Sequence, residues 1–403
     1  MTTETVVHWE QIHSIVNAMA EHFDGTWRQR ERKIGTGFLI IFLMRLCFSR
    51  TQSGYQIVIN EIWNAMKSSG VTLPQEKPLA ASSVCEARSK LDSHVIHEMN
   101  REVVDSFLSL NHDRFRWNQR RLFVVDGSTI HLPPELKKYG FGEMNPGKHY
   151  PQGKLSVLLH SGSGIAVDVL LDNKGDERDL ARKHLNSLLP DDVVLYDRGY
   201  FGYEMLLSHI RSGIDAIFRL PSTSKYTQIQ EFFSNPAKPS QTVVAIEPSA
   251  KQKANIRKRN KNLECNICNL RLIRYFVNGV EYFLATTIMD ENIVPEEFAD
   301  VYHKRWGVEE HYKACKSILS MESFHAKSLN GVLQEIYTAE LLITLSRLIA
   351  VESESILSMA SGSQKKVNKQ MLEFLVRIYS KLKGRERAVP KARAHKIVKR
   401  TVN

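Results

Sequence analysis

Two aspartates stand where the chain could bind a metal ion. Asp126 ends an apolar stretch that begins at Arg121, and Asp197 directly follows the apolar stretch 192–196. Each therefore lies just past the carboxyl end of a predicted strand. Ligand sites form at strand ends in open α/β sheets, so two carboxylates from neighbouring strands could share one metal site. Either aspartate alone is equally typical of a turn.

A third carboxylate lies in the segment YHKRWGVEEHYKACK, whose pattern indicates a helix. At about 100° per residue, four of its side chains project within about 60° of one another: Tyr302, Arg305, Glu309 and Lys316. A carboxylate between an arginine and a lysine suits a metal ligand beside an anionic substrate, because the acid binds the cation and the bases hold phosphates. The alternative is a solvated face with ion pairs, such as one between Glu309 and Lys313.

The spacing of these four residues resembles the signature of the DDE transposases of bacterial insertion sequences, in the group named after insertion sequence four. Two, three and six residues separate the tyrosine, arginine, glutamate and lysine in turn. Upstream, VVDGSTI around Asp126 and LYDRGYF around Asp197 resemble the first and second catalytic aspartate motifs of that group. The resemblance runs from about Arg121 through Lys316, with the motifs in the same order.

This resemblance implies a role for each motif residue. It implies a catalytic triad that also binds the metal ions, formed by Asp126, Asp197 and Glu309. It implies contacts with DNA ends by Tyr302, Arg305 and Lys316. The implied fold is α/β, a ribonuclease-H-like mixed-sheet core with a β-rich insertion between the second aspartate and the glutamate, an N-terminal helical domain and C-terminal helices.

The chemistry expected of such a site is phosphodiester cleavage and strand transfer. Two divalent ions about 4 Å apart can activate the attacking oxygen and stabilise the leaving one. Three carboxylates suit Mg²⁺, which prefers oxygen ligands, with Mn²⁺ as a substitute. The expected partners are double-stranded DNA, as terminal inverted repeats and target, and a second copy of the chain in a synaptic complex. Some relatives place a tryptophan soon after the second aspartate for a hairpin step; here Tyr200, Phe201 and Tyr203 stand there.

The elements that must position these residues follow from the apolar periodicity. Residues 1–115 read as helices, including Trp9–Phe23 and Ile57–Met66. Ser82 and Ser83 could cap a short helix through Ala87–Leu91 that exposes Arg88 and Lys90. That helix could read DNA, or it could be ordinary helical packing.

From Arg121 the periodicity changes to that of strands and helices in the order strand, strand, strand, helix, strand, helix, strand, which indicates a mixed sheet with an antiparallel side. Residues 221–280 read as a β-rich or loop-rich insertion with a basic cluster, Lys251–Lys261. The dipeptide Asn278-Gly279 predicts a tight hairpin that returns the chain to the main sheet. Helices are then expected over 296–319, 332–350 and 367–382. The resulting domains are a helical DNA-end-binding domain (1–115), two parts of the core (116–220 and 281–350), the insertion (221–280), and a helix with a basic arm (351–403).

Composition and charge limit the class of protein. The 403 residues are 42% hydrophobic and 25% charged, as in globular proteins, which excludes disordered and fibrous classes. The longest apolar run, Gly37–Phe48, is too short for a membrane span and contains Arg45. Five irregularly spaced cysteines, including the lone pair Cys265 and Cys268, favour reduced thiols in a cytoplasmic, nucleoid-associated protein.

The positive charge is concentrated at one end of the chain. The formal net charge is +11, and residues 377–403 carry ten Lys or Arg against one acid, which leaves +2 for the rest. Such an arm suits phosphate-rich partners, although a solvated terminus has the same composition. The sequence therefore predicts a transposase. The alternatives are a metal-dependent nuclease that does not join strands and a non-catalytic DNA-binding relic.

Overall fold

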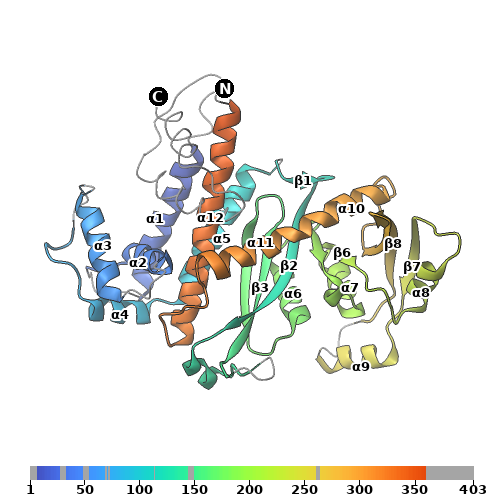
Figure 1. Ribbon diagram of the computed structural model, residues 1–403, viewed down its shortest axis with the longest axis horizontal. Coiled ribbons are helices and arrows are strands. Elements are labelled where there is room, and N and C mark those ends of the chain that lie inside the picture. Colours follow the sequence, from blue (N-terminus) through green and yellow to red (C-terminus); the bar gives the residue numbers. More distant parts are fainter. Residues whose placement is uncertain are drawn as a thin grey trace. The chain divides into compact units, whose positions relative to one another are not determined.

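The computed structural model consists of two compact units, a helical unit and a sheet unit (Figure 1). The structure describes residues 7–27, 33–48, 54–68, 70, 73–112, 114–143, 149–259 and 264–359. The helical unit consists of Met1–Asn111, His131–Pro151 and His311–Asn403. The sheet unit consists of His112–Ile130 and Gln152–Glu310.

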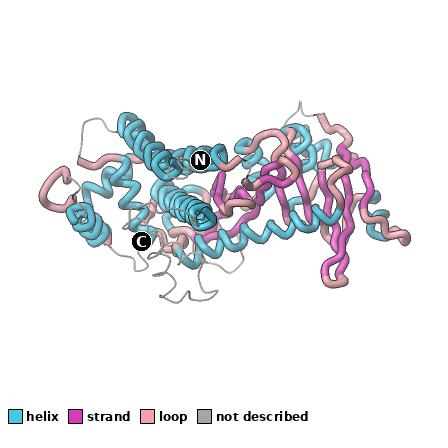
Figure 2. The backbone as a smooth tube through the Cα atoms, turned by 90° about the horizontal axis from the view of Figure 1, so that it is seen from above, coloured by secondary structure: helices cyan, strands magenta, loops and turns pink. Residues whose placement is uncertain are grey.

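The sheet unit is built on one mixed sheet. The described strands are β1 (Arg116–Trp117), β2 (Arg120–His131), β3 (Gln152–His160), β4 (Ile165–Asp172), β5 (Val193–Tyr196), β6 (Asp215–Arg219), β7 (Gln241–Ile246), β8 (Cys268–Val277) and β9 (Val280–Thr286). Their order is β4-β3-β2-β5-β6-β9-β8-β7, with β1 paired to β2. The central strands β2, β5 and β6 are parallel, whereas β3–β4 and β6–β9–β8–β7 are antiparallel. This is the mixed sheet with an antiparallel side that was expected. Figure 2 shows the strands in magenta beside the cyan helices.

The strand residues explain why helices cover this sheet. All four residues of β5 are buried, and so are eight of the nine in β3, which is typical of strands covered on both faces. The helices of this unit are α6 (Glu177–His184), α7 (Tyr203–Ser212), α8 (Thr227–Ser234), α9 (Ala250–Arg259) and α10 (Pro295–His303). Pro295 occupies the first turn of α10, where its missing N–H leaves no hydrogen bond unmade.

The segment 221–280 differs in part from its expected form. It contains strands β7 and β8, but helices α8 and α9 as well, and both strands extend the central sheet. The hairpin prediction is confirmed: β8 and β9 pair up to Val277 and Val280, and the two turn residues have positive φ angles of 49° at Asn278 and 77° at Gly279. A two-residue turn of this kind needs positive φ at both central positions.

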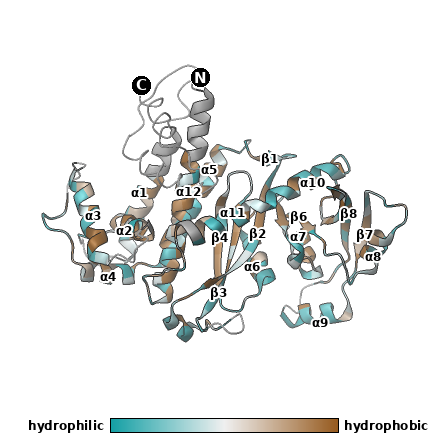
Figure 3. Ribbon diagram, in the orientation of Figure 1, coloured by the Kyte–Doolittle hydropathy of each residue, from teal (hydrophilic) through white to brown (hydrophobic). Residues whose placement is uncertain are grey.

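The helical unit packs its helices around an apolar core. Its helices are α1 (Val7–Trp27), α2 (Thr36–Phe48), α3 (Tyr55–Ser68), α4 (Ala81–Lys90), α5 (Ser93–Leu110) and α12 (Leu329–Met359). Fully buried side chains from α2, α3, α5 and α12, such as Leu43, Ile59, Ile96 and Leu341, form one cluster. The hydrophobic colouring of α2 in Figure 3 agrees with this position at the core. No helix among the described residues is long and apolar enough to span a bilayer.

The prediction for α4 was wrong in two respects. Its N-cap is Ala80, which makes no side-chain cap hydrogen bond, so Ser82 and Ser83 lie inside the helix. Arg88 is buried rather than exposed, because its guanidinium is paired with Glu335 of α12 at 2.6 Å. A buried arginine cannot read DNA bases, so ordinary packing accounts for this position.

The helix expected over 296–319 is interrupted. After α10 come a 3₁₀ turn, η4 (Lys304–Trp306), a short helix, α11 (Gly307–Lys313), and a π-helical turn, η5 (Ala314–Ile318). A 3₁₀ turn advances about 120° per residue, so the angular positions computed for a regular helix hold only within each piece. Helix α12 includes the predicted 332–350. The expected helix 367–382 and the basic arm lie outside the described residues.

Candidate active site

Asp126 lies inside a strand rather than at its end, since β2 continues to His131. Its side chain is partly buried, and the Gly127 N–H donates a 2.9 Å hydrogen bond to its Oδ1. Burial raises the pKa of this carboxyl, and the negative charges of Glu177 and Asp197 raise it further, against the lowering effects of Gly127 and Arg305. The charged form of Asp126 is therefore destabilised, chiefly by burial.

The strand register places Asp197 beside Asp126. In the parallel pair β2–β5, Val124 lies opposite Leu195, and each aspartate follows two residues later. A shift of two residues keeps side chains on the same face of a strand, and neighbouring strands are about 4.8 Å apart. Asp197 follows β5 directly, as predicted, and is half-buried. The two carboxylates thus leave adjacent strands at the same level and on the same side.

Arg305 contacts Glu309 and interacts electrostatically with the two aspartates. Its Nη2 lies 2.8 Å from Glu309 Oε1, four residues later in the chain. Burial would lower the pKa of this guanidinium, but Tyr302, Glu309, Asp197 and Asp126 together raise it. One buried cation therefore interacts with all three carboxylates, and all four groups belong to the sheet unit. The Nε of Arg305 is buried without a hydrogen-bond partner.

Tyr302 and Lys316 occupy different surroundings. The Tyr302 hydroxyl donates to the carbonyl oxygen of Tyr196, the residue before Asp197, at 3.2 Å. Burial raises the pKa of Tyr302, so the phenol stays protonated and can act as a donor. Lys316 belongs to the helical unit, where its Nζ lies 3.9 Å from Glu322 Oε1. Five of the six predicted site residues therefore lie in one unit, and Lys316 lies in the other.

A fourth acid was missed by the sequence reasoning. Glu177, in the first turn of α6, lies so close to Gly127 that a Cβ there would come within 3.0 Å of the glutamate Cδ. A side chain at this position would therefore require Glu177 to move by a few tenths of an ångström. Glu177 is paired with Lys154 at 2.7 Å. The local signal was an acidic first turn, which indicates only a helix start; Asp176 does cap α6, accepting from the N–H groups of Arg178 and Asp179.

A buried hydrogen-bonded chain lies beneath Asp126. His184 Nδ1 is 2.7 Å from Asp168 Oδ2, and His184 Nε2 is 3.0 Å from the Ser156 hydroxyl. That hydroxyl in turn lies 3.4 Å from the main-chain oxygen of Asp126. Asp168, His184 and Ser156 are all buried, so this chain supports the strand rather than meeting a substrate. Asp168 is accordingly a structural residue.

The aromatic residues after Asp197 belong mainly to the core. Tyr200 and Tyr203 are buried, and only Phe201 is partly accessible. The ring of Phe201 packs edge-on against Phe218, with centroids 5.6 Å apart. Two of the three aromatic rings at this position are therefore out of contact with solvent.

The donor set suits a hard divalent cation. Three carboxylates supply the oxygen ligands that Mg²⁺ prefers. Burial and the negative charges of Glu177 and Asp197 raise the pKa of Asp126. A bound cation would offset both effects. Glu309 is bound to Arg305 and remains partly exposed, so it can exchange one cationic partner for another.

Comparison with known proteins identifies proteins to which this chain is similar. Residues 117–345 match the family model described as a transposase DDE domain. The chain is 23% identical over 337 residues to the transposase InsG of insertion sequence element IS4 from Escherichia coli, covering 80% of this chain and 71% of InsG. It is 24% identical over 168 residues to the putative transposase InsZ of the same organism, covering 40% of this chain and 56% of InsZ. Among solved structures, the piggyBac transposase synaptic complex with hairpin DNA matches at 11% identity and a TM-score of 0.46, over 98% of this chain and 82% of that one.

Proposed function

The chain belongs to the transposase DDE domain family, and from this premise we propose that it is a transposase of an insertion element. It would cut DNA at the terminal inverted repeats of its own element and join the 3′ ends to target DNA. The observation that supports this most is the grouping of Asp126, Asp197 and Glu309 around the single guanidinium of Arg305.

The three carboxylates would hold divalent metal ions, Mg²⁺ in the cell with Mn²⁺ as a substitute. When bound, the ions would activate the attacking oxygen and stabilise the leaving oxygen of the phosphodiester. The rigid sheet fixes Asp126 and Asp197 at one level, which limits the reorganisation needed to bind. Glu309 sits on a separate helix, so it can close the site from the other side.

The remaining side chains would bind the DNA end. Arg305 would bind a phosphate oxygen once Glu309 turns to the metal, because its guanidinium would then lose its carboxylate partner. Its buried Nε without a partner is a donor that a phosphate could accept from. Tyr302 and Lys316 would make further contacts with the DNA end. The two ends of the element must be held together, so a homodimer is expected on DNA. The protein would act at the nucleoid, in the cytoplasm.

Two other functions use the same residues. A nuclease would cut the ends without joining them, and a relic would bind them without cutting. A supercoiled plasmid that carries the element's ends, incubated with the protein and Mg²⁺, separates the three. We expect joined products; cleaved ends alone would indicate a nuclease, and a gel shift without cleavage would indicate a relic.

A matched pair of variants tests the assignment of the site. Glu309→Ala and Asp197→Ala should reduce cleavage by more than the roughly 10–100-fold that loss of an outer-shell partner costs, while binding of the ends persists. Glu310→Ala changes the exposed neighbour of Glu309 on the same helix and should cleave normally. Cleavage by Asp197→Ala at the wild-type rate would refute the assignment.

A further inference from the structure

The helical unit contains a buried cluster of three potential metal ligands, separate from the three carboxylates. His311 comes from α11, Cys315 from the π turn η5, and Glu340 from α12. The three residues are at most 2% exposed. The cluster thus combines a buried histidine and a buried cysteine with a glutamate that is itself buried on α12.

The distances between the ligand atoms are close to those around a tetrahedral zinc ion. His311 Nε2 lies 2.9 Å from Glu340 Oε2 and 3.5 Å from Cys315 Sγ, and Cys315 Sγ lies 3.4 Å from Glu340 Oε1. Zinc bond lengths and tetrahedral angles put such ligand atoms roughly 3.4–3.6 Å apart. The separation of His311 Nε2 and Cys315 Sγ agrees with this range. The other two separations run to different oxygens of Glu340, and one ligand atom from each of the three residues lies within 4.8 Å of the others.

Hydrogen bonding leaves one ligand atom of this cluster and one neighbouring hydroxyl unsatisfied. Glu340 Oε2 is buried and has no hydrogen bond of proper geometry, although His311 Nε2 is in contact with it. The hydroxyl of Thr344, one turn further along α12, is also buried without a partner. Unsatisfied buried polar atoms are rare, and an ion is one recognised explanation for them.

We propose that His311, Cys315 and Glu340 bind a zinc ion. An imidazole and a thiolate favour zinc over the hard ions that suit an all-oxygen site. A zinc ion with one thiolate, one carboxylate and a neutral imidazole carries no net charge, so its burial avoids the large penalty of an isolated ion. The three protein ligands leave a fourth tetrahedral position for a water molecule.

The placement of the ligands suggests a structural role. Cys315 lies in a π turn, a rare conformation that is frequent at functional sites. His311 and Cys315 are four residues apart, and Glu340 is 25 residues beyond Cys315 on another helix. A bound ion would therefore tie η5 to α12. This site does not depend on the proposed transposase activity.

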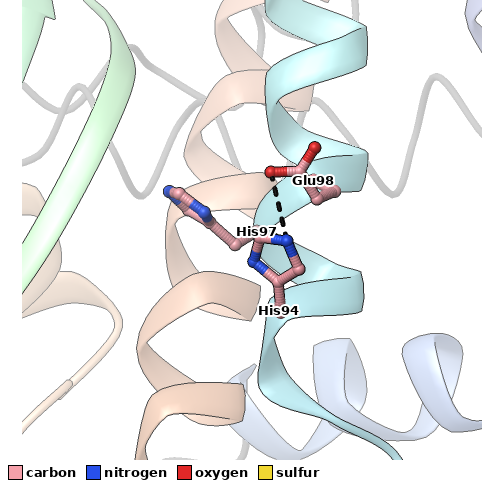
Figure 4. Close-up of side chains that lie close together, drawn as sticks. All are labelled: His94, His97 and Glu98. Atoms are coloured by element: carbon pink, nitrogen blue, oxygen red, sulfur yellow. Dashed lines mark ion pairs between the residues drawn. The ribbon is translucent and has the colours of Figure 1, made fainter. Parts of the chain in front are cut away.

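A second cluster is the weaker candidate and serves as the control. His94, His97 and Glu98 lie on α5, with His94 and Glu98 facing each other at 3.6 Å and His97 turned away (Figure 4). The His97 ring stacks on Tyr337 at 4.7 Å instead. The His94 side chain is 67% exposed, so solvent satisfies it without a metal.

Zinc content of the full chain tests the proposal. Protein purified under reducing conditions, loaded with zinc chloride and freed of excess metal, should retain about one zinc per chain by mass spectrometry. His311→Gln and Cys315→Ser should retain less than a tenth of that. His94→Gln, Cys268→Ser and the double variant Asp126→Asn with Asp197→Asn should retain all of it, because each leaves the cluster intact.

Cobalt substitution tests the thiolate directly. Wild-type protein loaded with Co²⁺ should show a thiolate-to-metal charge-transfer band that Cys315→Ser lacks while its circular dichroism stays unchanged. If Cys315→Ser fails to fold, Glu340→Gln tests the same site through zinc content. The proposal is overturned if the wild type retains no zinc, if a folded Cys315→Ser variant keeps it, or if His94→Gln loses it.

Discussion

At the residue scale, the site depends on how a few charges balance one another. The three acids are predicted to form the site because each sits in a short motif of fixed spacing. Glu177 was not, because only the fold brings the first turn of α6 against Gly127. Arg305 is predicted to contact the DNA end, but its ion pair with Glu309 depends on the local turn of η4 and α11.

The charges around Asp126 predict the direction in which the pH dependence of DNA cleavage should shift when one of them is removed. The negative charge of Glu177 raises the pKa of Asp126, so Glu177→Gln should lower that pKa. The carboxylate would then persist to lower pH, and the acid limb of the pH profile of kcat/KM for DNA cleavage should move to lower pH. That profile reports ionisations of the free enzyme, so it is the measurement to make.

A variant that should shift the acid limb in the opposite direction is the control. Arg305 lowers the pKa of Asp126, so Arg305→Ala should move the same limb to higher pH, whereas Arg305→Lys keeps the charge and should move it less. If Glu177→Gln and Arg305→Ala shifted the limb in the same direction, Asp126 would not be the group that titrates.

At the element scale, local signals were reliable and distant contacts were not. The β8–β9 hairpin was predictable because Asn278 and Gly279 alone determine the turn. The strands and helices around Asp126 and Asp197 follow from apolar runs a few residues long. The burial of Arg88 was not predictable, since its partner Glu335 lies 247 residues away in the chain. Sequence composition also could not show that β7 extends the central sheet beyond β8, because strand pairing is a long-range choice.

The buried pair of Arg88 and Glu335 should control the stability of the helical unit. The Arg88 guanidinium also donates to Gln334 Oε1, to the Gly331 carbonyl and to the Tyr55 hydroxyl. Arg88→Met would leave the Glu335 carboxylate buried without its cation, and such a loss costs about 3–5 kcal/mol. Urea unfolding followed by circular dichroism measures the change in the free energy of unfolding.

Lys90 offers a matched comparison two residues further along α4. It pairs with Glu86, but both side chains are more than 40% exposed. Lys90→Met should therefore change the free energy of unfolding by no more than about 0.5 kcal/mol. Equal effects of the two substitutions would mean that the burial of Arg88 contributes nothing to stability.

At the scale of the whole molecule, the distribution of charge indicates that non-specific DNA binding and the binding of the DNA end depend on different parts of the chain. Almost all of the net charge lies in residues 377–403, outside the catalytic motifs. Within the sheet unit the other basic group is α9, with Lys251, Lys253, Arg257 and Lys258. The cations that surround the carboxylates are largely paired with acids, as Arg305 is with Glu309 and Lys154 with Glu177. Non-specific affinity should therefore come from the arm.

Removal of the arm should change the salt dependence of DNA binding. Ending the chain at Val376 lowers the formal charge from +11 to +2. Each phosphate neutralised contributes about 0.9 to the slope of log affinity against log salt, so loss of six contacts would reduce the slope by roughly 5. Fluorescence anisotropy with a random-sequence duplex over a range of salt measures it. Gln substitutions at Lys251, Lys253, Arg257 and Lys258, the four basic residues of α9 other than Arg259, should change the slope less than the truncation does. If the truncated protein kept the full slope and the α9 variant lost it, the contacts with phosphates would belong to the insertion, and the arm would be a solvated terminus.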